Sequence, residues 1–315
     1  MRMLITGGSG FIGSHLTERL LSEGHEVIVV DNFSTGQKAF LNDVISSKPC
    51  QLIYGDLLDE DVLDTAMHKV EFVWHLAANA DVRYGTKYPR RDLEQNTIAT
   101  FNVLESMRRN GVRNIAFSST GSVYGDAPVI PTPEDCPFPE QTSLYGASKL
   151  ACEGLISAYC EGFDMHGWIF RFVSILGERY THGHIVDFFG QLQNHPGQLH
   201  ILGNGEQRKS YLYVHDCIDA MLAAVKVKQK RAEILNLGTD EYINVNDSVD
   251  IITSTLGFRP VRTYSGGDRG WVGDSPFICL DCTRMRSLGW TPRHSIRDGI
   301  IKTVTWLQSN SWVYQ

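Results

Sequence analysis

The chain has 315 residues, of which 42% are hydrophobic and 21% charged, a composition typical of a globular protein. Its formal net charge of −7 argues against non-specific binding to nucleic acid. The sequence shows no apolar run of membrane-spanning length and no secretory signal at its start. Seven scattered cysteines, with a single Cys-x-x-Cys pair at 279 and 282, predict reduced thiols and no metal site. We expect a cytoplasmic protein without membrane or nucleic-acid partners.

The first elements predict a dinucleotide-binding unit. An apolar strand at residues 3–5 leads into Gly7, Gly10 and Gly13, and an amphipathic helical pattern then runs to Gly24. In this motif the first glycine permits a tight turn, the second lets the backbone approach a pyrophosphate, and the third lets the helix pack close to the strand. The helix N-terminus adds N–H groups and a positive dipole end for the phosphates.

The second strand, residues 26–30, ends on Asp31, near where the ribose-binding acid of this motif falls. A carboxylate there accepts hydrogen bonds from the ribose hydroxyls and repels a 2′-phosphate, so it favours NAD over NADP. The alternative is an ordinary turn aspartate at a strand end. Asp56, after a third strand at 51–54, either accepts from an adenine amino group or caps the next helix.

Later elements continue the alternation of strands and helices. Five prolines between residues 127 and 140 predict an irregular loop, and the βα rhythm is lost after the sixth strand. The elements predicted from apolar periodicity are strands at 71–75, 114–117, 167–172, 209–214 and 234–237, and helices at 92–110, 145–160, 216–226 and 296–307.

These elements predict an α/β fold, a Rossmann-type doubly wound parallel sheet with a smaller C-terminal α/β lobe that closes over the cofactor and binds substrate. We expect residues 1–173 and about 209–238 in the NAD-binding domain. Residues 174–208 and 239–315 are expected in the smaller, substrate-binding lobe.

Two features suggest catalysis. Hydroxyl side chains at 118–122 follow the strand at 114–117, at the sheet edge where α/β folds bind ligands. Tyr145 and Lys149 are four residues apart and so share one helix face. A nearby ammonium lowers the pKa of a tyrosine from about 10 and makes it a usable general base. The alternative for this pair is a plain surface contact.

Eight motifs make the chain resemble the extended short-chain dehydrogenase/reductases, and within them the UDP-glucose (UDP-galactose) 4-epimerases. They cover nearly the whole length. They are TGGSGFIGSHL at 6–16, VVDNFSTG at 29–36, GDL at 55–57, HLAA at 75–78, SSTGSVYG at 118–125, YGASK at 145–149, QRKSYLYV at 207–214 and RGWVGD at 269–274.

The resemblance implies tightly bound NAD. Asp31 and Asn32 would hold the adenosine ribose, Asp56 the adenine, and Asn96 would support the site from its helix. The other implied cofactor contacts are Gly7, Gly10, Phe11, Ile12, Gly13, Leu57, Leu76, Ala77, Ala78, Ser118, Ser119, Tyr145 and Lys149.

The resemblance also implies a reaction. Tyr145 would take the proton from the sugar 4-hydroxyl while C4 gives a hydride to NAD⁺, and the 4-keto sugar would turn and take the hydride back on its other face. Lys149 would depress the tyrosine pKa and hold the nicotinamide ribose, and Thr120 would hydrogen-bond the same 4-hydroxyl.

The substrate end departs from the family pattern. Ser174 replaces a usual asparagine, and Lys209 replaces an arginine that grips the diphosphate, so either Lys209 or its neighbour could serve. His182 and His184 either contact substrate or are loop residues. The implied substrate contacts are Thr120, Ser122, Tyr145, Ser174, Arg208, Lys209 and Arg269.

Other activities compete with this interpretation. A 4,6-dehydratase of the family needs an Asp-Glu pair after the threonine, where this chain has Gly121 and Ser122. A 4-ketosugar reductase would use NADPH, which Asp31 disfavours. Epimerisation of another UDP-sugar, such as an N-acetylhexosamine or a uronic acid, stays open, and a non-catalytic NAD sensor is the remote alternative. By analogy with the family we expect a homodimer formed through the helices at 92–109 and 145–160.

Overall fold

The computed structural model describes residues 1–45, 49–79, 82, 84–137, 140–270 and 277–314. The chain forms two compact units. Unit 1 comprises Met1–Val123, Ser143–Arg171 and Met221–Leu235, and unit 2 comprises Tyr124–Thr142, Phe172–Ala220 and Asn236–Gln315. Relative to the predicted boundaries, residues 124–142, 172–173, 209–220 and 236–238 group with unit 2. The roles assigned to the two parts of the chain stay predictions.

A seven-stranded sheet carries unit 1, and its strand order is β11-β6-β5-β4-β1-β2-β3. The pairs β1–β2, β1–β4, β2–β3 and β4–β5 are parallel. The order reverses between β1 and β4, which is the point where doubly wound sheets bind ligands. This confirms the predicted fold class. The strands are β1 (Arg2–Thr6), β2 (Glu26–Asp31), β3 (Cys50–Tyr54), β4 (Phe72–His75), β5 (Asn114–Thr120), β6 (His166–Phe172) and β11 (Ala232–Leu237).

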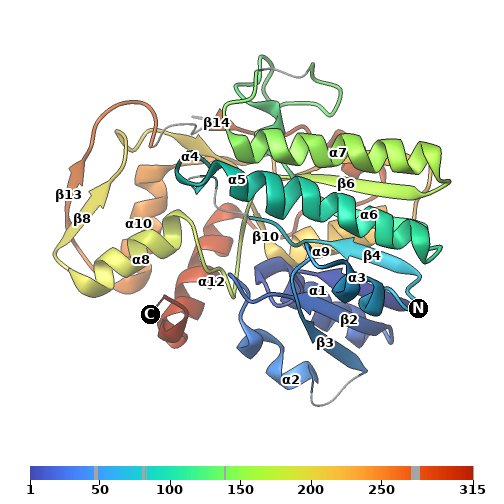
Figure 1. Ribbon diagram of the computed structural model, residues 1–315. Helices are drawn as coiled ribbons and strands as arrows, with labels where there is room; N and C mark the ends of the chain where they lie inside the picture. Colours follow the sequence, from blue (N-terminus) through green and yellow to red (C-terminus); the bar gives the residue numbers. More distant parts are fainter. Residues whose placement is uncertain (46–48, 80–81, 83, 138–139, 271–276, 315) are drawn as a thin grey trace. The chain divides into compact units, whose positions relative to one another are not determined.

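The helix predicted at 92–110 is one helical rod made of three pieces, with a π-helical stretch in the middle. It lies beside α7, as Figure 1 shows. The Ser143 side chain accepts from the Gly146 N–H and so caps the start of α7. The three pieces of the rod are α5 (Pro89–Asp92), η2 (Leu93–Ile98) and α6 (Ala99–Arg109), and the other longer helices of unit 1 are α1 (Phe11–Ser22), α3 (Glu60–Ala66) and α7 (Leu144–Gly162). Short helices of four residues are η1 (Lys38–Leu41), α2 (Asn42–Ile45), α4 (Tyr84–Lys87) and, at the boundary of the two units, η3 (Gly121–Tyr124).

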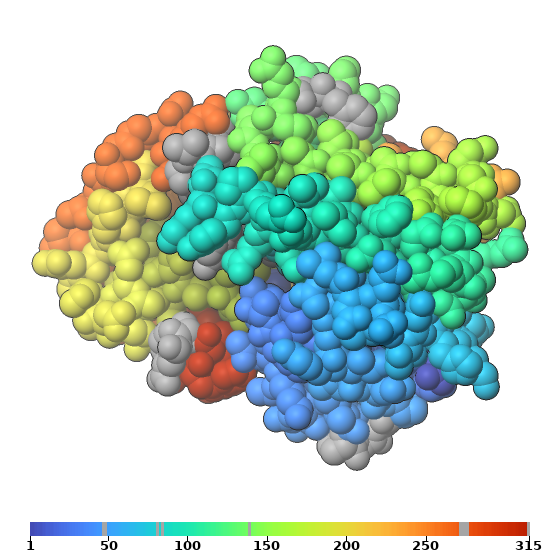
Figure 2. Space-filling model, viewed as in Figure 1, coloured from blue at the N-terminus to red at the C-terminus, as the bar shows by residue number. Residues whose placement is uncertain are grey.

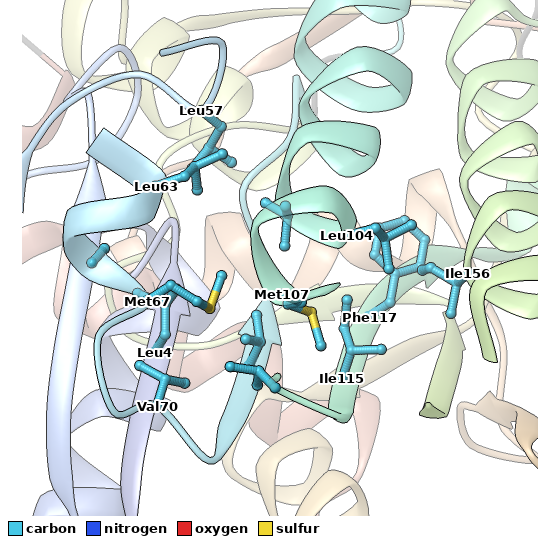
Figure 3. Close-up of a cluster of buried hydrophobic side chains, with 14 of the residues drawn as sticks. Leu4, Leu57, Leu63, Met67, Val70, Leu104, Met107, Ile115, Phe117 and Ile156 are labelled. Carbon is cyan, nitrogen blue, oxygen red and sulfur yellow. The ribbon is translucent and has the colours of Figure 1, made fainter. Parts of the chain in front are cut away.

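The core of unit 1 lies between the sheet and the helices α3, α6 and α7 (Figure 3). Leu4 and Ile115 come from the strands, and Leu63, Met107 and Ile156 come from the helices, and each is fully buried. Burial of each such side chain contributes about 1.5–3 kcal/mol. This packing holds α7, with Tyr145 and Lys149, against the end of β5.

Unit 2 consists of helices and of short strands that form two-stranded and three-stranded sheets. The predicted strand at 209–214 is two strands, since β9 and β10 pair with different partners. Its elements are β7 (Ser174–Leu176), α8 (His184–Asn194), β8 (Gln198–Ile201), β9 (Arg208–Lys209), β10 (Tyr211–Tyr213), β12 (Ile243–Asn244), α10 (Val245–Leu256), β13 (Val261–Tyr264), β14 (Phe277–Ile278), α11 (Thr283–Ser287), α12 (Ile296–Ser309) and η4 (Ser311–Tyr314); α9 (Val214–Ala224) belongs partly to each unit.

The described helices include none that is both long and apolar enough to cross a membrane. The sequence did not predict α8 or α10.

Candidate active site

The glycine loop between β1 and α1 has the geometry of a phosphate cradle. Gly7 has a φ of +70°, and a Cβ there would lie 2.8 Å from the Ala77 backbone. A Cβ at Gly13 would lie 2.1 Å from the Gly7 carbonyl oxygen, so only glycine lets α1 pack this closely. Gly10 holds the N-cap position of α1 and has no side chain to cap it. The buried Ser9 hydroxyl has no hydrogen-bond partner in the described part of the chain.

The ends of β2 and β3 bring the predicted adenosine-binding residues together. Asp31 accepts from the Ser9 N–H at 2.9 Å and the Phe33 N–H at 2.8 Å, which leaves lone pairs for further donors. Burial raises the pKa of Asp31, and these two N–H donors oppose the rise. Asn32 Nδ2 donates to Asp56 Oδ2 at 2.8 Å. The loop and these three side chains fit a dinucleotide with free ribose hydroxyls.

The segment after β4 lies against the glycine loop. The Leu76 N–H donates to the Thr6 carbonyl oxygen at 3.2 Å and the Ala77 N–H to Thr6 Oγ1 at 3.3 Å. His75 is fully buried between two hydroxyls, with Nδ1 2.7 Å from Thr6 Oγ1 and Nε2 2.9 Å from Thr100 Oγ1. Burial lowers the pKa of His75 to about 3, and the Lys149 charge adds to the effect. The imidazole is therefore neutral and structural.

The Lys149 side chain contacts the carboxyl end of β5. Its Nζ donates to the Ser118 carbonyl oxygen at 2.8 Å and lies 4.6 Å from the centre of the Phe117 ring. Burial lowers the pKa of Lys149 to about 8, against the opposing effects of Cys152, Glu153 and Asp92. The lysine therefore has a protonation state that can change near neutral pH.

Tyr145 and Thr120 meet in unit 1, since their hydroxyls are hydrogen-bonded. Thr120 Oγ1 also lies 3.2 Å from Ser122 Oγ and accepts from the Ser122 N–H at 3.1 Å. Burial raises the pKa of Tyr145 to about 12, and the Thr120 hydrogen bond opposes the rise. The predicted lowering of this pKa by Lys149 is therefore wrong for the protein by itself, because burial is the largest cause and the nearby Asp92 and Cys152 raise the pKa further.

A buried polar cluster supports this centre. Asn96 Nδ2 donates to Ser148 Oγ at 2.8 Å, and Asn96 Oδ1 accepts from the Asn79 N–H at 2.9 Å. Asn79 Nδ2 donates to Asp92 Oδ1 at 2.8 Å, and Ser148 Oγ donates to the Tyr145 carbonyl oxygen at 2.8 Å. Sequence reasoning missed Asp92, although a carboxylate four residues before Asn96 shares its helix face.

Ser119 differs from its neighbours, because its buried hydroxyl donates to the Glu153 carboxylate. Leu57 is a core residue whose carbonyl oxygen accepts from Asn102 Nδ2 at 3.0 Å. Any cofactor contact by these two residues would therefore use the backbone.

The side chains of Arg208 and Lys209, neighbours in β9 of unit 2, point to opposite faces of the strand. Successive residues of a strand point to opposite faces. The Arg208 guanidinium lies 4.3 Å from the centre of the Phe277 ring and 5.5 Å from that of Tyr242. Lys209 lies on the other face, where its charge lowers the pKa of His184.

The two histidines differ as well. His184 begins α8, with Nε2 2.9 Å from Ser248 Oγ and Nδ1 3.2 Å from the Tyr211 hydroxyl. Burial is the larger cause that lowers the pKa of His184 to about 3. It is therefore a neutral packing residue of unit 2, whereas His182 is exposed.

The remaining predicted substrate residues lie on the surface of unit 2. Ser174 is exposed at the start of β7. Arg269 Nη2 donates to Asp126 Oδ2 at 3.0 Å. Most of the RGWVGD stretch lies outside the described residues, at 271–276.

Known proteins share this architecture over the full chain. A family profile described as the NAD dependent epimerase/dehydratase family matches residues 3–238. UDP-glucose 4-epimerase of Mycolicibacterium smegmatis is 32% identical over 99% of this chain and 100% of that protein. A crystal structure of UDP-galactose 4-epimerase aligns with a TM-score of 0.89 at 39% identity, over 99% of this chain and 100% of that one. UDP-glucose 4-epimerase from Thermotoga maritima, solved with UDP-glucose, aligns with a TM-score of 0.90 at 31% identity, over 99% and 100%.

Relatives with other reactions match too. UDP-glucuronic acid decarboxylase 1 of Xenopus tropicalis is 30% identical over 96% of this chain and 71% of that protein. A dTDP-glucose 4,6-dehydratase from Streptomyces venezuelae, solved with NAD bound, aligns with a TM-score of 0.91 at 26% identity, over 100% of this chain and 99% of that one.

The fold and the glycine loop define an enzyme of the NAD-dependent Rossmann class. The chain belongs to the NAD dependent epimerase/dehydratase family, as the match over residues 3–238 shows.

Proposed function

We propose that this protein inverts C4 of a UDP-hexose of the glucose and galactose type, through a transient 4-keto sugar. One observation carries the proposal: Thr120 and Tyr145 share a hydrogen bond at the end of β5, with the buried Lys149 ammonium on the same helix face as Tyr145. Bound NAD would accept the C4 hydride and return it. The protein's own groups move the proton and hold the sugar.

Tyr145 would exchange the proton of the sugar O4, and Thr120 would hold that oxygen in line. Because burial raises the tyrosine pKa to about 12, a positive charge must stabilise the phenolate during turnover. Lys149 is the cation that the chain itself supplies on this helix face, one turn away.

The absence of a carboxylate at Gly121 and Ser122 favours epimerisation over 4,6-dehydration, which is expected to need an acid and a base there. In unit 2 we assign the diphosphate to Lys209, because Arg208 is stacked on Tyr242 and Phe277. Lysine is a point charge and suits a diphosphate without bidentate geometry.

Product analysis tests the proposal. The purified protein is incubated, without added NAD, with UDP-glucose, UDP-galactose, their N-acetyl counterparts and UDP-glucuronic acid. A mixture of C4 epimers from the first two sugars is expected. Tyr145→Phe keeps bound NAD and is expected to lose at least about a hundredfold in kcat, the low end of general-base contributions. Faster conversion of another sugar, loss of water or loss of CO₂ would each contradict the proposal.

A further inference from the structure

A buried ion pair lies one helical turn beyond Lys149. Glu153 on α7 is 3% exposed and Arg171 on β6 is 1% exposed. Arg171 Nη2 donates to Glu153 Oε2 at 2.6 Å and Arg171 Nε to Oε1 at 3.0 Å. Ser119, 2% exposed, donates its hydroxyl to the same carboxylate. The function proposed above uses none of these three side chains.

Stability alone is a weak reason for such a pair, because desolvating two charges offsets much of their attraction. Its connections are more informative. Ser119 stands between Ser118, whose carbonyl oxygen accepts from Lys149, and Thr120. Glu153 follows Lys149 by four residues and so lies on the same face of α7. The hydrogen bond from Ser119 to Glu153 therefore ties β5 to α7, the two elements that carry the groups proposed for catalysis, and Arg171 ties the same carboxylate to β6.

The pair also belongs to the charge environment of Lys149. Cys152 and Glu153 act on the ammonium from α7, Asp92 from α5, His75 from β4 and the Ser118 carbonyl from β5. Of these, Glu153 and Asp92 are carboxylates, and each favours the protonated lysine. Arg171 neutralises Glu153 and holds it in place.

We propose that Glu153 and Arg171 are positioning residues of the active site, which fix Thr120 on β5 and Lys149 on α7 in their working arrangement through Ser119. This role rests on the function proposed above. It predicts two separable effects. The Ser119 hydroxyl holds β5 in place against α7, and the Glu153 charge keeps Lys149 protonated.

Ser119→Ala tests the first effect, since it removes the link and leaves the ion pair. The expected result is a kcat lower by about tenfold to a hundredfold, the loss that small misplacements produce, with KM and the pH profile close to wild type. Glu161→Gln is the matched control, because Glu161 is an exposed carboxylate two turns further along α7.

Glu153→Gln tests the second effect, because glutamine still accepts from Ser119 but carries no charge. The alkaline limb of kcat against pH, where Lys149 loses its proton, is expected to move to lower pH by roughly one unit. The double variant Glu153→Met/Arg171→Met removes both charges together, so folding does not suffer from an uncompensated charge. It is expected to shift the alkaline limb in the same direction but by less than Glu153→Gln does, because the Arg171 charge is removed together with the carboxylate.

Folded variants with wild-type kcat and wild-type pH profile would overturn the proposal. The Kd for NAD is measured in the same preparations and separates this failure from a failure of the proposed function. If the wild type converts no UDP-sugar, Ser119→Ala and Glu153→Gln are still expected to bind NAD several-fold more weakly, since Lys149 is then misplaced. Unchanged Kd values would overturn the positioning role.

Discussion

At the scale of single residues, burial decides the electrostatics of the site. The sequence places Tyr145 and Lys149 on one helix face, which the structure confirms through α7. The direction of the tyrosine pKa could not be predicted from spacing, because spacing reveals the nearby charge but not the desolvation. Burial raises the pKa of Tyr145 and lowers that of Lys149, so each group is driven toward its neutral form.

Desolvation of His75 also predicts that acid lowers the stability of the folded protein. In the unfolded chain this imidazole takes up a proton near its ordinary pKa of 6.5, whereas in the folded protein it stays neutral down to about 3. Unfolding therefore binds a proton in this window, and the free energy of unfolding falls as the pH falls.

We expect His75→Gln to weaken that dependence by about 1.4 kcal/mol per pH unit between about pH 6 and pH 4, measured by urea unfolding. His195→Gln is the control, since the His195 side chain is exposed, and its slope should equal that of wild type. Equal slopes for His75→Gln and wild type would contradict the burial of a neutral imidazole.

At the scale of elements, the sequence predicted best where a continuous apolar run met a glycine or an acid. β1, β2 and β4 are such runs and lie within a residue or two of their predicted bounds. The helix α8 was missed although its apolar residues recur at helical spacing, because its flanks and interior carry Gly183, His184 and Gly190. The π-helical stretch η2 has no sequence signal that we could identify.

Gly13→Ala tests the fit of α1 on the loop. The new Cβ would lie 2.1 Å from the Gly7 carbonyl oxygen, so the helix must move away from the cradle. A loss of about 2–3 kcal/mol in the free energy of unfolding is expected, together with loss of bound NAD. Gly154→Ala, at an exposed position of α7 with open space around it, should instead stabilise by about 0.5–1 kcal/mol and keep NAD. NAD retained in full by Gly13→Ala would count against the cradle.

At the scale of the whole molecule, the predicted homodimer has a candidate surface in unit 1. Figure 2 shows residues 84–109 and 144–162 next to each other on one exposed face. Five large apolar side chains that belong to these two segments or follow α7 directly are exposed: Leu93, Ile98, Phe101, Leu144 and Phe163. Exposed apolar side chains that cluster on one face are typical of an interface.

We expect Phe101→Glu, at a ring that is 44% exposed, to convert the dimer into a monomer in gel filtration, because a charge would be buried at the interface. Val261→Glu is the control at a 70% exposed apolar residue of unit 2, and it should stay dimeric. A wild type that elutes at the chain mass of 35.3 kDa at micromolar concentration would contradict the dimer.

The proposed function requires that the C4 hydrogen leaves the sugar and returns to the same sugar within one protein. The most direct measurement uses UDP-glucose deuterated at C4, incubated with the purified protein in ordinary water without added NAD. We expect a mixture of both C4 epimers that retain the deuterium at C4. Epimers that have lost the deuterium to solvent would contradict it, since the proton held by Tyr145 exchanges with water and a returned hydride does not.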